Sequence, residues 1–120
     1  MSSPIGAFPH SSSSVYQAAC QALLALERVA GALVPVWQPL GPEQRAAGLA
    51  VVQLLARGLA CSGAAQRSLF RQACVQAAEA ESALSAAGLL GAAPAELVTP
   101  AVAAYMALGE SLRPQGGRRR

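Results

Sequence analysis

The sequence contains no lysine, aspartate or asparagine, and its only histidine is His10. Charged residues make up 12% of the 120 positions, and aromatic residues only 4%. Alanine, arginine, glycine and proline are abundant instead, which is the bias that a GC-rich bacterial genome imposes on neutral positions. The composition therefore indicates a bacterial origin rather than a function.

These absences remove most catalytic and metal-binding chemistry. A di-metal helical bundle needs several inward carboxylates and Glu-x-x-His pairs, and His10 lies before the first predicted helix. A serine or cysteine nucleophile needs a nearby base, and the predicted helices offer no histidine for that role. The glycines form no phosphate-binding loop, because the pattern G-x-x-x-x-G-K-[ST] is missing. We expect no enzymatic activity, and therefore no catalytic residue, metal site, cofactor or small-molecule substrate.

Long uninterrupted apolar runs are also missing, although 53% of the residues are hydrophobic. A membrane-spanning helix needs about 20 mostly apolar residues, and the two longest candidates, 23–37 and 49–60, are interrupted by charged or amide side chains. Residues 1–14 lack both a basic start and a continuous apolar segment, so they do not form a secretory signal. We expect a cytoplasmic protein that does not associate with membranes.

The cysteines, Cys20, Cys61 and Cys74, are odd in number and form no C-x-x-C pair. This pattern favours reduced, buried thiols in a cytosolic protein, with a metal or redox role as the alternative.

The length fits one domain. Residues 1–13, rich in proline, glycine and serine, are predicted to be a disordered leader, 14–113 the folded domain and 114–120 a flexible arginine-rich tail. Nine arginines and six glutamates give the net charge of +3, and removing the last three residues leaves six of each. A short arginine tail binds phosphate backbones through counterion release, or it is simply a solvated chain end.

Apolar residues at helical spacing predict four helices, at about 14–38, 42–61, 65–87 and 94–112. Pro35 should kink or end the first helix, and Gly91 should end the third in a left-handed conformation. Short connections between helices of similar length predict an all-α, antiparallel up-down-up-down four-helix bundle. Because alanine contributes little buried area, the alanine-rich core favours oligomerisation. The predicted inward residues include Tyr16, Leu23, Trp37, Leu49, Val52, Leu55, Leu59, Phe70, Leu84, Tyr105 and Leu108.

Two stretches are more specific than a generic bundle. One is Gln44-Arg45-Ala46-Ala47, followed by Ala56-Arg57-Gly58, and the other is Phe70 to Glu79, followed by Gly88-Leu89-Leu90-Gly91. They resemble a bacterial four-helix bundle family whose members read roughly Q-x-R-R-A-A-x-S, then N-I-A-E-G, then F-x-x-x-A-x-x-S-x-x-E. That family includes proteins encoded in intervening sequences of 23S ribosomal RNA genes and accessory variability proteins of diversity-generating retroelements.

The chain departs from the family pattern, as a divergent member would. Arg57 replaces the family's glutamate before glycine, and Ala77 or a neighbour replaces its serine. The resemblance covers 15–112 in layout but only 44–91 in motif. It implies a homo-oligomer, specifically a pentamer, and RNA or DNA binding through a basic surface. Glu79 occupies the family's second glutamate position, where a structural ion pair with Arg45 or Arg57 is expected.

Arginines gather around the hairpin of the second and third predicted helices. Glu43, Glu79 and Glu81 are close enough in sequence to neutralise them, so a solvated, ion-paired face is the alternative to a nucleic-acid surface. We expect a non-enzymatic, oligomeric binding or scaffold module that contacts RNA or DNA; the alternative is a protein–protein adaptor without nucleic-acid binding. The candidate contacts are Arg45, Arg57, Arg67, Arg71, Arg118, Arg119 and Arg120.

Overall fold

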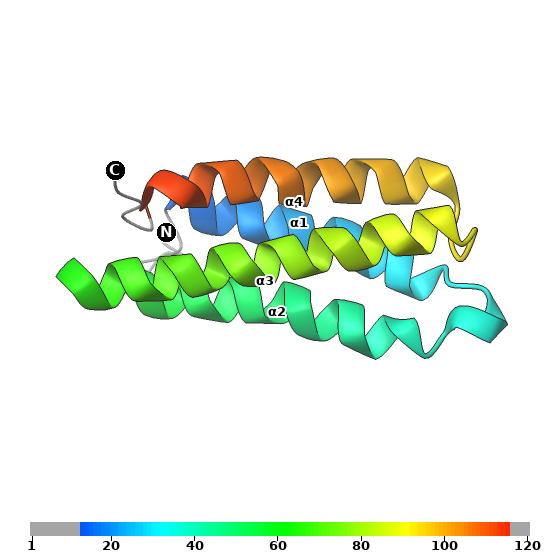
Figure 1. Cartoon of the computed structure of the whole chain (residues 1–120), viewed down its shortest axis with the longest axis horizontal. Helices are drawn as coiled ribbons and strands as arrows, with labels where there is room; N and C mark the ends of the chain where they lie inside the picture. Colours follow the sequence, from blue (N-terminus) through cyan, green and yellow to red (C-terminus); the bar gives the residue numbers. More distant parts are fainter. Residues whose placement is uncertain (1–12, 116–120) are drawn as a thin grey trace, which may run out of the picture.

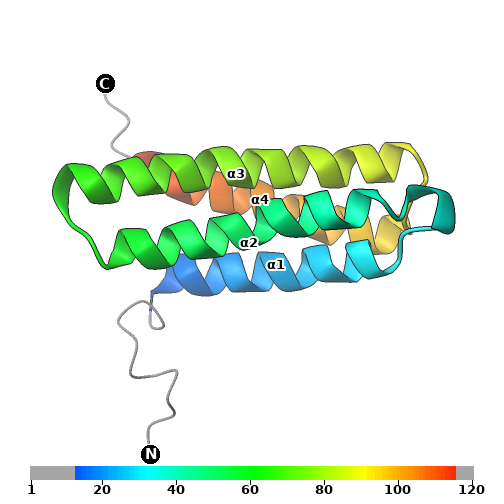
Figure 2. The same cartoon turned by 90° about the horizontal axis from the view of Figure 1, so that it is seen from below.

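The structure is a computed structural model that describes residues 13–115. Four helices form its fold (Figures 1 and 2). Each helix packs antiparallel against the next along the chain, and α4 returns beside α1. The predicted all-α, up-down-up-down four-helix bundle is confirmed. The helices are α1 (Ser14–Gly31), α2 (Leu40–Leu59), α3 (Gly63–Leu89) and α4 (Ala95–Gln115), with a short 3-10 helix at Pro35–Trp37.

The predicted leader up to residue 12 and the terminal arginines Arg118, Arg119 and Arg120 lie outside the described residues. Ser13 belongs to the start of the bundle, because its side-chain oxygen accepts a hydrogen bond from the Tyr16 backbone N–H at 3.3 Å. This is an N-cap, one residue earlier than Ser14, the residue predicted for it. The helical part also extends to Gln115, beyond the predicted limit of 113.

The first helix is shorter than predicted, because it ends at Gly31 rather than near residue 38. Pro35 accounts for the break: the residue before a proline is pushed out of the helical region, and Val34 is extended with ψ 156°. The Val34 backbone N–H then donates to the Ala92 carbonyl at 2.9 Å, which ties the α1–α2 connection to the α3–α4 turn. Trp37 is consequently only partly buried, at the edge of the core.

The other helix ends differ by a few residues from the predictions. α2 begins at Leu40, so that Pro42 lies within its first turn, where a missing N–H costs no helical hydrogen bond. Gly91 has φ +67° and follows α3, as predicted for a left-handed helix end. α4 begins at Ala95, one residue after the predicted start, and continues through Pro100.

Small residues fill much of the core. Almost half of the buried apolar residues are alanines, with Leu26, Leu55, Leu84 and Tyr105 among the largest fully buried side chains. Leu49 was predicted to face inward, but it is 47% exposed. α2 buries Gly48, the preceding residue, and Leu49 therefore points to the exposed groove between α1 and α2.

The cysteine prediction is wrong in part. Cys20 and Cys61 are exposed, while Cys74 is half-buried between α3 and α4. All three are free thiols in the described chain. Cys20 lines the open groove between α1 and α2, and Cys61 follows the end of α2, so neither position belongs to a buried helical stripe.

Gly58 is the position where the fold depends most directly on the absence of a side chain. A Cβ atom at Gly58 would lie 2.6 Å from Cε1 of Phe70. We expect Gly58→Ala to lower the free energy of unfolding by about 1–3 kcal/mol, because the buried ring has to move. The measurement is urea unfolding followed by circular dichroism.

Gly109 provides the matched control, because a Cβ atom there would meet nothing within 4 Å. Gly109→Ala should raise the free energy of unfolding by about 0.5–1 kcal/mol through helix propensity alone. Equal effects of the two substitutions would contradict the close packing of Phe70 on Gly58.

Candidate nucleic-acid interface

The α2–α3 connection is held by a side-chain cap. The Gln66 side-chain Nε2 donates to the carbonyl of Gly58 at 3.0 Å and to that of Cys61 at 2.9 Å. Both carbonyls lie at the end of α2, and the Gly58 carbonyl also accepts a hydrogen bond from the Cys61 backbone N–H at 3.1 Å. This cap fixes the end of α2 against the start of α3, and it therefore places Arg57 and Arg67 at the same end of the bundle.

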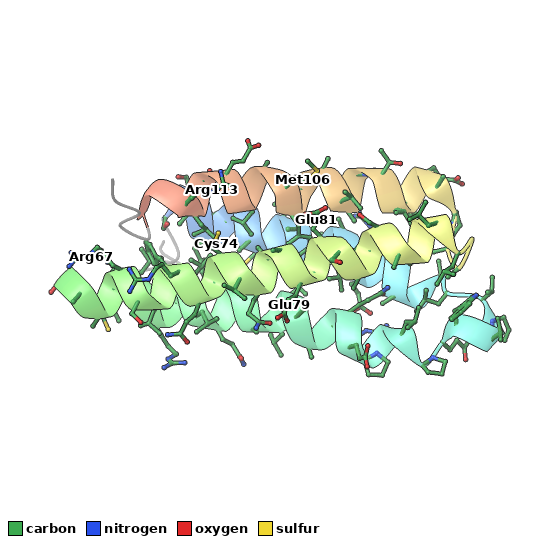
Figure 3. The ribbon with its side chains drawn as sticks, in the orientation of Figure 1. Arg67, Cys74, Glu79, Glu81, Met106 and Arg113 are labelled. Atoms are coloured by element: carbon green, nitrogen blue, oxygen red, sulfur yellow. The ribbon has the colours of Figure 1, made fainter. Side chains whose placement is uncertain are left out.

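A second contact sets the register between α3 and α4. The thiol of Cys74 points to the backbone carbonyl of Gly109, with a sulfur–oxygen distance of 3.7 Å. Arg71 lies one turn before Cys74 and Arg113 one turn after Gly109, and the helices are antiparallel. Arg71 and Arg113 are therefore at the same level, and Arg67 lies one turn further out on α3 (Figure 3).

These four side chains, Arg57, Arg67, Arg71 and Arg113, are called the arginine end. All four are exposed, and Glu110 is the only acidic residue in the adjoining turns of the described helices. The remaining glutamates lie elsewhere: Glu79 and Glu81 are about halfway along α3, and three others are near the opposite end. Those three are Glu27, Glu43 and Glu96, accompanied by Arg28 and Arg45.

The folded chain is thus neutral in sum but not in distribution. Between residues 13 and 115 the six arginines and six glutamates cancel, yet four of the arginines share one end with a single glutamate. Antiparallel packing produces this separation, because it brings the last turns of α2 and α4 beside the first turns of α3. The ion-paired face stays the alternative interpretation of this end, because Glu81 and Glu110 line one hollow together with Arg113.

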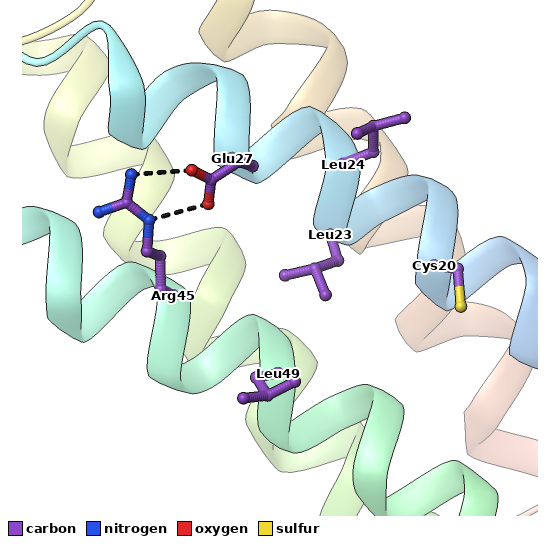
Figure 4. Close-up of a pocket in the computed structure, with 6 residues that line it drawn as sticks. All are labelled: Cys20, Leu23, Leu24, Glu27, Arg45 and Leu49. Atoms are coloured by element: carbon purple, nitrogen blue, oxygen red, sulfur yellow. Dashed lines mark hydrogen bonds and ion pairs between the residues drawn. The ribbon is translucent and has the colours of Figure 1, made fainter.

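Arg45 is separate from the arginine end. Its Nε and NH2 groups donate to the two carboxylate oxygens of Glu27, both at 2.8 Å, across the exposed α1–α2 face (Figure 4). The hydrogen bond from Arg45 holds the pKa of the Glu27 carboxyl below its usual range. The structure therefore gives Arg45 a different partner from the predicted Glu79, because its position on α2 faces α1 rather than α3.

The alternative pair, Arg57 with Glu79, is separated along the bundle. Arg57 is level with Gln66, as the cap to Gly58 shows, and Glu79 lies 13 residues further along α3. At 1.5 Å per residue this is about 20 Å, which is beyond the combined reach of the two side chains. Glu79 instead lines a groove between α2 and α3 together with Glu43 and Gln76.

Two side chains of the core carry polar groups: Tyr105 was predicted to face inward, whereas Gln44 was not. Gln44 and Tyr105 are each only 1% exposed, and the Gln44 amide and the Tyr105 hydroxyl have no hydrogen-bond partner. A Cβ atom at Gly48 would lie 2.9 Å from the Tyr105 oxygen, so the hydroxyl lies against the α2 backbone. Apolar periodicity cannot detect Gln44, because it is a polar residue within a buried stripe.

No group of three or more His, Cys, Asp or Glu side chains that could hold a metal ion is found between residues 13 and 115. Within the same range, no helix is both long and apolar enough to cross a membrane. No protein-family model matches the chain, and no curated protein is significantly similar to it. The resemblance of residues 44–91 to the bundle family stays a prediction, and the function must be inferred from the geometry of the molecule.

The unpartnered hydroxyl of Tyr105 gives a prediction that opposes the usual effect of a core substitution. An unsatisfied buried polar group costs about 1–3 kcal/mol, so Tyr105→Phe should raise the free energy of unfolding by a similar amount. Tyr16→Phe is the control, because Tyr16 is only partly buried and its side chain interacts with Cys20. Thermal unfolding of both variants checks the difference, and a destabilised Tyr105→Phe would contradict it.

The same residue predicts a pH dependence. Burial raises the pKa of Tyr105 well above its ordinary value of 10.0. Because the pKa is higher in the folded than in the unfolded chain, the stability is fully present below about pH 10 and is lost as the pH rises further. Tyr105→Phe should reduce this alkaline loss, as measured by unfolding at pH 8 to 11.

Proposed function

We propose that this chain is a non-enzymatic, homo-oligomeric helical bundle of the cytoplasm that binds RNA or DNA through the arginine end. The observation that carries this proposal is the charge separation: four exposed arginines on three helices share one end with a single glutamate. A solvated face without a partner would be expected to mix its charges, as the Arg45–Glu27 pair does. Clustered arginines instead attract phosphates and release condensed counterions.

The chain itself extends this cluster. The described structure ends with α4 at the arginine end, and Arg118, Arg119 and Arg120 follow Gln115 within five positions. Five residues span at most about 18 Å, so covalent connection alone keeps these arginines near the same end. Together with the arginine end, they make up the seven arginines that we propose as phosphate contacts.

The aromatic and amide side chains beside the arginine end indicate how nucleic acid would bind there. Between residues 13 and 115, the aromatic side chains near this end are Tyr16 and Phe70, and both pack against the core rather than presenting an open ring for stacking bases. Gln66 is engaged by the backbone of α2. The arginine end is therefore suited to phosphate backbones rather than to base recognition, and we propose binding without sequence preference.

The homo-oligomeric part rests on packing. The alanine-rich core provides little apolar burial per residue, while Leu24, Leu49, Leu89 and Met106 remain about half or more exposed. Covering such side chains against another copy would add the burial that the monomer lacks. The family resemblance would make the assembly a pentamer.

The exposed apolar side chains also favour the second candidate function. A protein–protein adaptor would use these side chains to hold a different protein and would not bind nucleic acid. Salt-dependent nucleic-acid binding separates the two functions, because an adaptor of this kind predicts none.

Binding is tested by fluorescence anisotropy with a labelled 20-base-pair duplex in 50 to 200 mM salt. If all seven arginines contact phosphates, the logarithm of the association constant should fall with that of salt with a slope of about −6. Removing residues 116–120 should make the slope shallower by about 3, to about −3. Arg67→Gln with Arg71→Gln should make it shallower by about 2.

Arg28→Gln with Arg45→Gln is the matched control, since it removes the same charge at the opposite end. We expect its slope to remain close to that of the unchanged protein. Absence of binding to duplex, single-stranded DNA and structured RNA at 50 mM salt would refute the nucleic-acid function. If the double substitutions at Arg67 and Arg71 and at Arg28 and Arg45 weakened the salt dependence equally, the assignment to the arginine end would be refuted.

A further inference from the structure

The exposed large apolar residues include two pairs that lie in grooves of the bundle. The first groove lies between α1 and α2, has a volume of about 420 Å³ and is lined by Cys20, Leu23, Leu24 and Leu49 (Figure 4). Leu24 and Leu49 are 49% and 47% exposed. The Arg45–Glu27 pair lies at the edge of this groove, with its two charges already neutralising each other. This surface is called the α1–α2 face.

The second groove lies between α3 and α4 and has a volume of about 610 Å³. Its lining includes small residues such as Gly88, Ala95 and Ala103, and no charged residue lines it. Leu89 and Met106 border it and are 91% and 51% exposed. This surface is called the α3–α4 face.

The two faces lie on opposite sides of the molecule. Packing follows the chain, α1 against α2, α2 against α3, α3 against α4 and α4 against α1, so the α1–α2 and α3–α4 pairs form opposite sides of the bundle. The faces also differ in shape, because one presents leucines and the other is a wider hollow lined partly by small residues. A head-to-tail contact between identical chains requires two different surfaces, and these two faces meet that requirement.

We propose that the α1–α2 face of one copy docks on the α3–α4 face of the next copy. This inference rests on the homo-oligomeric part of the proposed function and names the surfaces that carry it. Leu24 and Leu49 enter the α3–α4 groove, where Gly88 and Ala103 leave room for them. The groove has no charged lining, and the Arg45–Glu27 pair remains at the rim of the contact, so no unpaired charge has to be buried.

The size of the faces agrees with this contact. Helices of 18 and 21 residues, α1 and α4, are about 27 and 32 Å long. Two helices side by side are about 20 Å wide, which gives each face about 600 Å² in projection. Each partner in a stable complex contributes about 800 Å² of accessible surface. Because accessible surface follows the side chains and exceeds the projected area, a whole face is sufficient for one contact.

A head-to-tail contact has a consequence for the arginine end. Repetition of the same contact closes into a ring if the rotation between copies allows it. Every copy in such a ring has the same direction along the symmetry axis, so the arginine ends gather on one side. A two-fold dimer through the α1–α2 face alone, with its axis in the plane of that face and perpendicular to the helices, would make the two copies antiparallel and place their arginine ends on opposite sides.

The test uses two variants, each of which destroys one face. Leu24→Glu with Leu49→Glu removes the α1–α2 face, and Leu89→Glu with Met106→Glu removes the α3–α4 face. In size-exclusion chromatography with light scattering at about 100 µM, each variant alone should be a monomer. An equimolar mixture should contain a heterodimer, because one intact face of each kind remains. Val36→Glu with Val75→Glu is the control, since both side chains are exposed outside the grooves and the oligomer should persist.

Other outcomes overturn the contact in distinguishable ways. Self-association of one face variant alone, or a mixture that stays monomeric, refutes the head-to-tail pairing. An oligomer that persists in both face variants refutes these surfaces but leaves the homo-oligomeric function intact. A monomer of the unchanged chain at the same concentration refutes both. Circular dichroism of each variant checks that its helical content equals that of the unchanged chain.

Discussion

Close packing of helices through small residues is the constraint on which the other features of this protein depend. Gly48 admits the Tyr105 hydroxyl and the leucines of α1, and Gly58 admits the ring of Phe70. Alanines occupy much of the remaining interior. The helices can therefore approach closely, but each buried residue removes little apolar surface from water. The larger apolar side chains that remain, Leu24 and Leu89 among them, are left on the outer faces.

The antiparallel arrangement then determines where the charges lie. Arginines far apart in the sequence, Arg57, Arg67 and Arg113, come together because successive helices reverse direction. The cap from Gln66 and the contact between Cys74 and Gly109 show which turns of the neighbouring helices lie at the same level. A chain whose folded part carries no net charge thereby acquires one strongly basic end. The proposed phosphate binding uses one end of the bundle and the proposed self-association uses two of its sides, so neither would block the other.

Helix periodicity was sufficient for the existence and approximate position of four helices, and Gly91 was recognised as the end of the third. The interior was less predictable. Leu49 fits an apolar stripe in the sequence, but the rotation of α2 is set by glycines whose neighbours come from other helices. Gln44 is buried although it is polar, and Cys20 is exposed although cysteine is commonly buried. Pattern alone cannot decide these positions, because several registers of one helix bury similar numbers of apolar residues.

The sequence by itself determined the fold class, since apolar spacing, proline and glycine act locally within each helix. It also determined the total charge and the tail of three arginines. Only the tertiary structure decided which charges meet: it paired Arg45 with Glu27, away from the arginine end. Only the tertiary structure placed the two apolar grooves on opposite sides. The physical reason is that ion pairs and grooves depend on the rotation and register of neighbouring helices, which are fixed by packing between segments distant in the chain.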